Sequence, residues 1–140
     1  MDDSAADNIS LGFLHDAELL LVSIDARKRT MRLECQLEDG KQCCVMMDEL
    51  TEFRCEGLSR QNIVYEIRQS RRGEISDEEI ALWMKRILSF ADSFNETAEE
   101  KEKFWLGRLK KNEINLVVVD SSTGVTLAAV CEKLSVTEPS

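Results

Sequence analysis

Residues 30–48 constrain the fold of this chain most strongly, because their pattern predicts a β-hairpin. From 30 to 38 apolar and polar side chains alternate, which is typical of a half-buried strand. The apolar set is Met31, Leu33, Cys35 and Leu37, and the polar set is Arg32, Glu34, Gln36 and Glu38. Asp39-Gly40 follows directly, and this dipeptide is a strong signal for a tight turn between two strands.

The length of this turn decides which residues pair across the hairpin. A two-residue loop would pair Cys35 with Cys44 and turn the polar Gln42 onto the apolar face. A three-residue loop over 38–40 pairs Cys35 with Cys43 and keeps both faces consistent. Gly40 then supplies the left-handed residue that closes such a loop. We therefore predict the three-residue loop.

Five further segments have the composition of strands: residues 18–25, 52–55, 62–68, 114–120 and 125–134. The first of them carries apolar side chains on both of its alternating faces. One face has Leu20, Val22 and Ile24, and the other has Leu19 and Leu21. We therefore expect this strand to be buried on both faces.

Two capping boxes predict the starts of helices. Ser76 is followed three residues later by Glu79, and a helically spaced apolar stripe continues to Ala91, which predicts a helix over 77–93. Thr97 and Glu100 form the second box, which predicts a helix over 98–111. A strand through 104–109 is the alternative for this second segment.

The order of these elements, strands, then helices, then a strand hairpin, predicts an α+β domain. We expect a mainly antiparallel sheet of about six strands with one or two helices packed on one face. Residues 1–10 are expected to form a flexible acidic tail, 11–136 a single domain, and 137–140 a frayed C-terminus.

The charge balance excludes some classes of partner. The chain has 18 Lys and Arg against 27 Asp and Glu, a net charge of -9. Nucleic acid is therefore not an expected partner, because its phosphates attract basic surfaces. The apolar runs are far shorter than the roughly 20 residues that cross a bilayer, so no membrane association is expected. The first residues are acidic where a secretory signal would be basic, which predicts a cytoplasmic protein.

The cysteines and the single histidine predict no metal site. Five cysteines without a C-x₂-C pair indicate reduced, mostly buried thiols. His15 and Asp16 are adjacent, and we interpret them as a structural pair whose hydrogen bonds fix the start of the first strand. A catalytic pair of His15 with one of the cysteines remains the enzymatic alternative, because such partners meet in space rather than in sequence.

Acidic residues concentrate between 74 and 102, where nine acids stand against three bases. One interpretation is a solvated helix face, and the other is a surface that meets a basic partner. The candidate partner-facing acidic surface consists of Asp92, Glu96, Glu99, Glu100 and Glu102.

No motif of an enzyme is present. The sequence lacks a phosphate-binding glycine loop, a zinc-protease motif and the G-x-S-x-G of serine hydrolases. Because no catalytic constellation is assembled, we predict that the protein is not an enzyme, has no catalytic residues and requires no cofactor.

The N-terminal half resembles a known family. The run Phe13-Leu14-His15-Asp16-Ala17-Glu18-Leu19 opens it, and Arg29 to Leu33 and the Asp39-Gly40 turn follow. This pattern resembles small bacterial immunity proteins of polymorphic-toxin systems, which share a His-Asp-(Ala/Ser)-Glu-Leu start followed by a strand hairpin. The resemblance covers residues 13–65, with Phe53-Arg54-Cys55 and Gln61 to Val64 as its continuation. It implies a cytosolic, non-catalytic protein that binds and blocks a toxin, and it carries over no binding residues.

Two hypotheses of function follow. The first is a protein-binding domain, an immunity-type inhibitor whose partner is a basic toxin domain. The second is an oligomerising structural or regulatory module that acts through an exposed sheet edge or the region of Trp105. The sequence leaves open whether the protein is a monomer or a homodimer.

Overall fold

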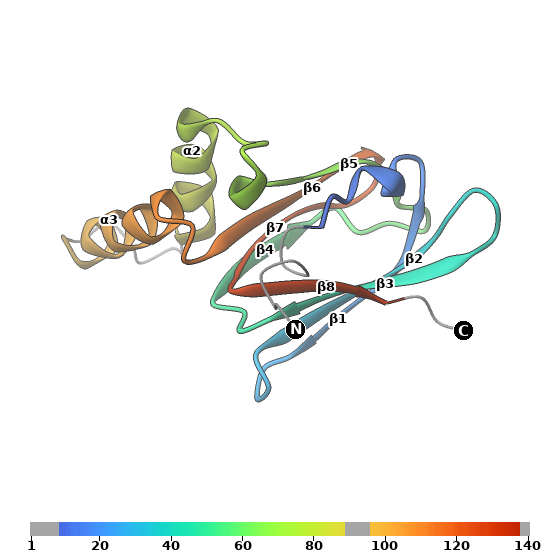
Figure 1. The fold of residues 1–140 in the computed structure, drawn as a ribbon, viewed down its shortest axis with the longest axis horizontal. Helices are drawn as coiled ribbons and strands as arrows, with labels where there is room; N and C mark the ends of the chain where they lie inside the picture. The colour runs from blue at the N-terminus through green and yellow to red at the C-terminus, as the bar shows by residue number, and fades with distance from the viewer. Residues whose placement is uncertain (1–8, 89–95, 138–140) are drawn as a thin grey trace.

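The protein has an α+β fold with a mostly antiparallel sheet and two α-helices, as predicted. The computed structural model describes residues 9–88 and 96–137 (Figure 1). In chain order the elements are η1 (Gly12–Leu14), β1 (Glu18–Asp25), β2 (Thr30–Gln36), β3 (Gln42–Asp48), β4 (Glu52–Glu56), β5 (Ile63–Gln69), η2 (Ser70–Arg72), α2 (Asp77–Leu88), α3 (Glu96–Lys110), β6 (Asn115–Thr123), β7 (Thr126–Cys131) and β8 (Lys133–Thr137). The last part of the helix predicted over 77–93 lies outside the described residues, as do 1–8 of the expected tail and 138–140 of the C-terminus.

The sheet has eight strands in the order β4-β7-β6-β5-β1-β2-β3-β8, so the expectation of about six was wrong. One cause is the segment 125–134, which we predicted to be one strand. It bends at Glu132, whose amide donates to the Asp48 carbonyl at 3.2 Å. The part before the bend pairs with β6 and β4, and the part after it pairs with β3. The apolar run through 127–131 continues up to the bend, so the periodicity gave no sign of it.

The connection through Glu132 forces the sheet to curl back on itself. Strand β7 is second from one end of the sheet and β8 is the opposite end, yet a single residue joins them. One residue spans at most about 3.6 Å, whereas neighbouring strands lie about 4.8 Å apart. The two ends of the sheet must therefore meet, and the strands form an incompletely closed barrel (Figure 1).

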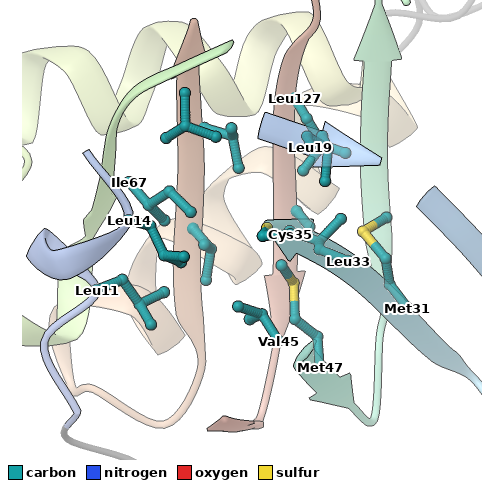
Figure 2. Close-up of a cluster of buried hydrophobic side chains, with 14 of the residues drawn as sticks. Leu11, Leu14, Leu19, Met31, Leu33, Cys35, Val45, Met47, Ile67 and Leu127 are labelled. Carbon is teal, nitrogen blue, oxygen red and sulfur yellow. The ribbon is translucent and has the colours of Figure 1, made fainter. Parts of the chain in front are cut away.

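The main hydrophobic core fills this barrel. Side chains from η1, the hairpin of β2 and β3, and β5 to β8 meet inside it, and Figure 2 shows Leu14, Leu33, Val45 and Leu127 among them. A second core lies outside the barrel, under the helices. Strands β6 and β7 serve both cores: Val117 and Val119 face inward, and Leu116 and Val118 face the helices. This two-sided burial explains the unbroken apolar run of β6.

Helices α2 and α3 lie together on one side of the sheet (Figure 1). They contribute Trp83, Met84, Ile87 and Leu109 to the second core. The Glu79 amide donates to Ser76 Oγ at 3.1 Å, as the capping box predicts. The helix at 96–110 also settles the alternative of a strand there. Neither helix, within the parts of the chain that are described, has the length and apolarity needed to cross a bilayer.

The predicted register of the β2–β3 hairpin is confirmed. Cys35 pairs with Cys43, and the loop is closed by a hydrogen bond from the Leu37 amide to the Lys41 carbonyl at 2.7 Å. Gly40 has φ +89°, the left-handed conformation that the three-residue loop requires.

The expectation that β1 is buried on both faces was wrong. Leu20 is 48% exposed, Leu21 is 45% exposed and Ile24 is 40% exposed. The reason lies in the pairing: β1 pairs with β2 along its length but with β5 only at Glu18, opposite Ile63. Beyond that point the barrel wall opens beside Ile24. Leu21 pairs with Glu34 and therefore lies on the outer face, where the core under the helices includes no residue of β1.

Two turns approach each other closely beside this opening: the one that ends at Asn62, before β5, and the one at Gly124, between β6 and β7. The buried Asn62 side chain accepts hydrogen bonds from the amides of Ser59 and Val125 at 3.0 and 3.1 Å, and donates to the Ser59 carbonyl at 3.0 Å. Gly124 lies against it with φ +92°. A Cβ on Gly124 would collide with Asn62 Oδ1 and come within 2.8 Å of the Gln61 carbonyl oxygen.

We expect Gly124→Ala to lower the free energy of unfolding by about 2 kcal/mol, because it adds a steric collision to the strain of a left-handed alanine. Gly40→Ala is the matched control: its φ is similar, but a Cβ there would meet nothing within 4 Å. Urea unfolding followed by circular dichroism measures both variants. Equal losses would contradict the role given to the close approach.

Candidate functional site

A hollow on the described surface lies where the barrel wall opens. This hollow, called here the β1–β4 groove, has a volume of about 640 Å³. Its lining comes from β1 and the turn after it, the β3–β4 connection, β4, α3 and the β7–β8 bend; the residues are Ile24, Asp25, Ala26, Arg29, Leu50, Thr51, Phe53, Trp105, Arg108 and Glu132. Volumes of this order are typical of ligand and peptide sites, which often lie in the mouths of barrels.

The apolar lining is a continuation of the barrel core. Residues that pair directly across a sheet point to the same face. Ile24 pairs with the fully buried Met31, and Phe53 pairs with the fully buried Ala129, so both side chains lie on core-facing sides of their strands. Among the described strands none closes the wall beside them, and both side chains stay accessible. The aromatic Trp105 of α3 completes this apolar surface.

Two cations and two anions surround the apolar lining. The Arg108 guanidinium stacks over the Trp105 ring at 5.4 Å from its centroid, and its Nε lies 3.3 Å from Glu113 Oε1. Arg29 Nε donates to the Leu50 carbonyl at 3.3 Å. The anions are Asp25 and Glu132. The groove can therefore offer an aromatic platform together with charges of both signs.

The strand edges beside the groove are also open. Within 9–88 and 96–137, residues 21–25 of β1 pair with β2 alone, and β4 is the last strand at its end of the sheet. Both strands contribute lining residues, so their outer edges border the same hollow. Each edge carries backbone amides and carbonyls that are able to pair with a further strand.

His15 and Asp16 lie where η1 meets β1, and neither residue lines the groove. His15 Nδ1 makes a hydrogen bond with the Tyr65 carbonyl, and the two rings meet edge to face at 5.5 Å. Asp16 has φ +67°, its amide donates to the Val64 carbonyl at 2.8 Å, and its carboxylate lies 3.5 Å from His15 Nε2. These contacts join the beginning of β1 to β5.

The candidate acidic surface is described only in part. Asp92 lies outside the described residues, and Glu96 and Glu99 are placed in α3 without a description of their side chains. Glu100 is exposed and Glu102 is half-buried. These two residues share α3 with Trp105 and Arg108 but are not among those that line the groove.

All five cysteines lie within the described residues, and none forms a disulfide. The pKa of the Cys35 thiol is raised to about 12, chiefly by burial and then by its neighbours Cys43 and Cys44. Burial also raises the pKa of Cys55, with Glu56 as the second cause. A thiol with a raised pKa is a weak nucleophile at neutral pH. In the described parts of the chain, no three His, Cys, Asp or Glu side chains gather in an arrangement that could hold a metal ion.

Sequence reasoning missed most of the groove. Ile24 and Phe53 have the pattern of core residues, and they do lie on core-facing sides; the opening beside them depends on pairing between distant segments. Of the residues that line the groove, only Trp105 had been singled out from the sequence as part of a surface. Comparisons with protein-family models, curated proteins and solved structures gave no match.

The raised pKa of Cys35 predicts a loss of stability in alkali. The folded protein keeps this thiol protonated up to about pH 12, whereas the unfolded chain ionises it near the ordinary value of about 9. Between these values the folded state holds more protons, so the free energy of unfolding falls as pH rises. Urea unfolding at about pH 8 and about pH 10.5 should show a loss about 2 kcal/mol larger in the native protein than in Cys35→Ala. The same loss in both proteins would contradict this assignment.

Proposed function

We propose that this protein is a non-catalytic protein-binding domain, an immunity-type inhibitor that binds and blocks a cognate toxin through the β1–β4 groove. The observation that carries this proposal is the groove itself: core-facing apolar side chains that stay open to solvent beside an aromatic ring and an arginine. Tryptophan and arginine dominate binding energy at protein interfaces, where they sit in desolvated pockets surrounded by weaker contacts.

Three features favour a protein partner over a small substrate. Leu20 and Leu21 of the same strand are also exposed, so β1 presents apolar surface in addition to the residues that line the groove. Its described lining includes no cysteine or histidine, and its one hydroxyl, on Thr51, donates to the Val130 carbonyl at 3.1 Å. The net charge of -9 favours a basic partner, because opposite charges speed the encounter of two proteins and like charges disfavour acidic ones.

The resemblance to immunity proteins supports the inhibitor interpretation. It covers residues 13–65, which include β1 and β4, the two strands that border the groove. An inhibitor needs no chemistry of its own, since occupying the active cleft of a toxin is sufficient. Toxins that act on nucleic acid have basic clefts, and an acidic protein suits such a cleft electrostatically.

The second candidate function is an oligomerising structural or regulatory module. The observation that favours it is the open edge of β1, because an exposed edge can pair with another copy of the same strand. Sedimentation at several protein concentrations separates the two functions: a monomer throughout the series supports the inhibitor, and a dimer supports the module.

Binding should depend on Trp105. Capture from a lysate of the source cell with immobilised protein should yield one basic partner at low salt and release it at high salt. Calorimetry with that purified partner should show at least about 10-fold weaker binding for Trp105→Ala, because the groove loses its aromatic platform. Leu82→Ala is the control: Leu82 is an exposed apolar residue on α2 that does not line the groove. A partner that binds Trp105→Ala as tightly as the native protein would exclude the groove, and the absence of a specific partner would contradict the function.

Charge reversal tests the acidic part of the proposal. Replacing Glu99, Glu100 and Glu102 by lysine should weaken binding of the basic partner and flatten its dependence on salt, because a screened attraction is removed. Affinity measured at about 50 and about 300 mM salt gives both quantities. Unchanged affinity would show that α3 contributes through Trp105 and Arg108 rather than through these carboxylates.

A further inference from the structure

We propose that Arg108 is a positioning residue of the β1–β4 groove: it holds the Trp105 ring in place, and binding depends on Arg108 through this ring rather than through a contact between Arg108 and the partner. The proposal rests on the function proposed above and adds how the aromatic part of that site is kept in shape. A ring that is already fixed before binding costs the partner less entropy to order.

Helix α3 is held only weakly by its own packing. Among its side chains that the structure describes, only Leu109 is fully buried, and Trp105 and Leu106 are half-buried at the margin of the second core. Gly107 lies between Trp105 and Arg108, and glycine weakens a helix interior because its backbone is unusually flexible. A Cβ at Gly107 would meet nothing within 4 Å, so no close neighbour requires a glycine there. The position of Trp105 therefore depends on further contacts.

Arg108 supplies such contacts through two carboxylates. Its Nε lies 3.3 Å from Glu113 Oε1, and its Nη2 lies 4.0 Å from Glu132 Oε1. The backbones of both partners are themselves fixed. The Glu113 amide donates to the Arg108 carbonyl at 3.0 Å, and the Glu132 amide donates to the Asp48 carbonyl at 3.2 Å. The guanidinium therefore joins α3 to the turn before β6 and to the bend between β7 and β8.

Arg108 also contacts the aromatic rings of α3. Its guanidinium carbon lies 5.4 Å from the centroid of the Trp105 ring and 6.0 Å from that of Phe104, and these two rings meet edge to face at 5.2 Å. Both distances are within the range in which a cation attracts an aromatic face. The Arg108 side chain is 25% exposed, and two of its nitrogens face carboxylates of the chain itself. These internal contacts favour a role in placing Trp105 over a direct contact with a partner.

A second pair of tryptophan and arginine provides an internal comparison. Arg86 lies over the Trp83 ring of α2 at 4.4 Å from the ring centroid, with the same spacing of three residues. Trp83 is only 7% exposed, and its Nε1 donates to Glu79 at 3.2 Å, so we expect this ring to stay ordered without its arginine. Neither Trp83 nor Arg86 lines the groove. Arg86 is therefore the matched control for Arg108.

The mobility of Trp105 in the protein alone tests the proposal without any partner. The two tryptophans give two indole N–H signals in NMR spectra, and Trp105→Phe identifies the signal of Trp105. In Arg108→Gln we expect the order parameter of this indole, measured by ¹⁵N relaxation, to fall from about 0.85 to below about 0.6. Glu113→Gln should lower it by a smaller amount, although Glu113 does not line the groove. Arg86→Gln should leave the Trp105 signal unchanged.

A strengthened helix separates the placement of the ring from the stability of α3. Gly107→Ala raises helix propensity without a steric collision, and it is added to Arg108→Gln if that variant loses helix by circular dichroism. We expect the helix content of the double variant to return to the native value while the Trp105 indole stays mobile. Recovery of both would overturn the proposal, because Arg108 would then act only on the helix.

A double-mutant cycle tests whether Arg108 acts through Trp105, with the partner captured by the native protein as the probe. Arg108→Gln should weaken binding at least about 5-fold in the native protein, but change it less than about 2-fold in Trp105→Ala, where the ring that it places is absent. Arg86→Gln removes the same charge and should change the affinity less than about 2-fold. Equal losses from Arg108→Gln in both backgrounds would show that Arg108 contacts the partner itself and would overturn the proposal.

The two measurements also separate this proposal from the proposed function. A rigid Trp105 indole in Arg108→Gln would overturn the positioning role, and the function would stand if Trp105→Ala still weakened binding. If no partner is captured, the inhibitor function is wrong, and a mobile indole in Arg108→Gln still supports the positioning role.

Discussion

The bend at Glu132 is the constraint on which the rest of the structure depends. Because one residue joins the strand beside β6 to the strand beside β3, the sheet has to curl until its ends meet. The curl encloses the main core and leaves the outer face of β6 and β7 to be covered by the helices. A flat sheet of the same strands would expose one of these two apolar faces to water.

The groove follows from the same constraint. Strand β4 pairs with β7 on one side only, and β1 separates from β5 after one pair. The wall of the barrel therefore has a gap between β1 and β4. Ile24 and Phe53 lie on the core-facing sides of their strands, and their side chains reach solvent at this gap. The site is therefore a region where the core is incompletely covered, and α3 adds Trp105 and Arg108 to it.

The local sequence patterns predicted those features of the fold that depend on residues close together in the chain. The alternation in 30–38 and the Asp39-Gly40 turn were sufficient for the register that pairs Cys35 with Cys43, and Ser76 was sufficient for the start of α2. They could not predict which distant strands pair. Leu20, Leu21 and Ile24 have the composition of a doubly buried strand, but β5 departs early and the core under the helices does not extend to β1, so they are exposed. The groove was unpredictable for this reason, since its lining comes from four separate stretches of the chain.

The closing position of β7 and β8 has a consequence for the order of folding. These strands, residues 126–137, pair with β3 and β4, which lie some 80 residues earlier in the chain. The hairpins of β1 to β3 can form early during synthesis, but the barrel cannot enclose its core until the last strands have left the ribosome. Pairing of such distant segments is slow, because loop closure has to precede the contacts that reward it. Until then the nascent N-terminal half exposes side chains that the finished barrel buries, such as Leu33 of β2 and Val45 of β3, and these are the surfaces a chaperone would have to cover.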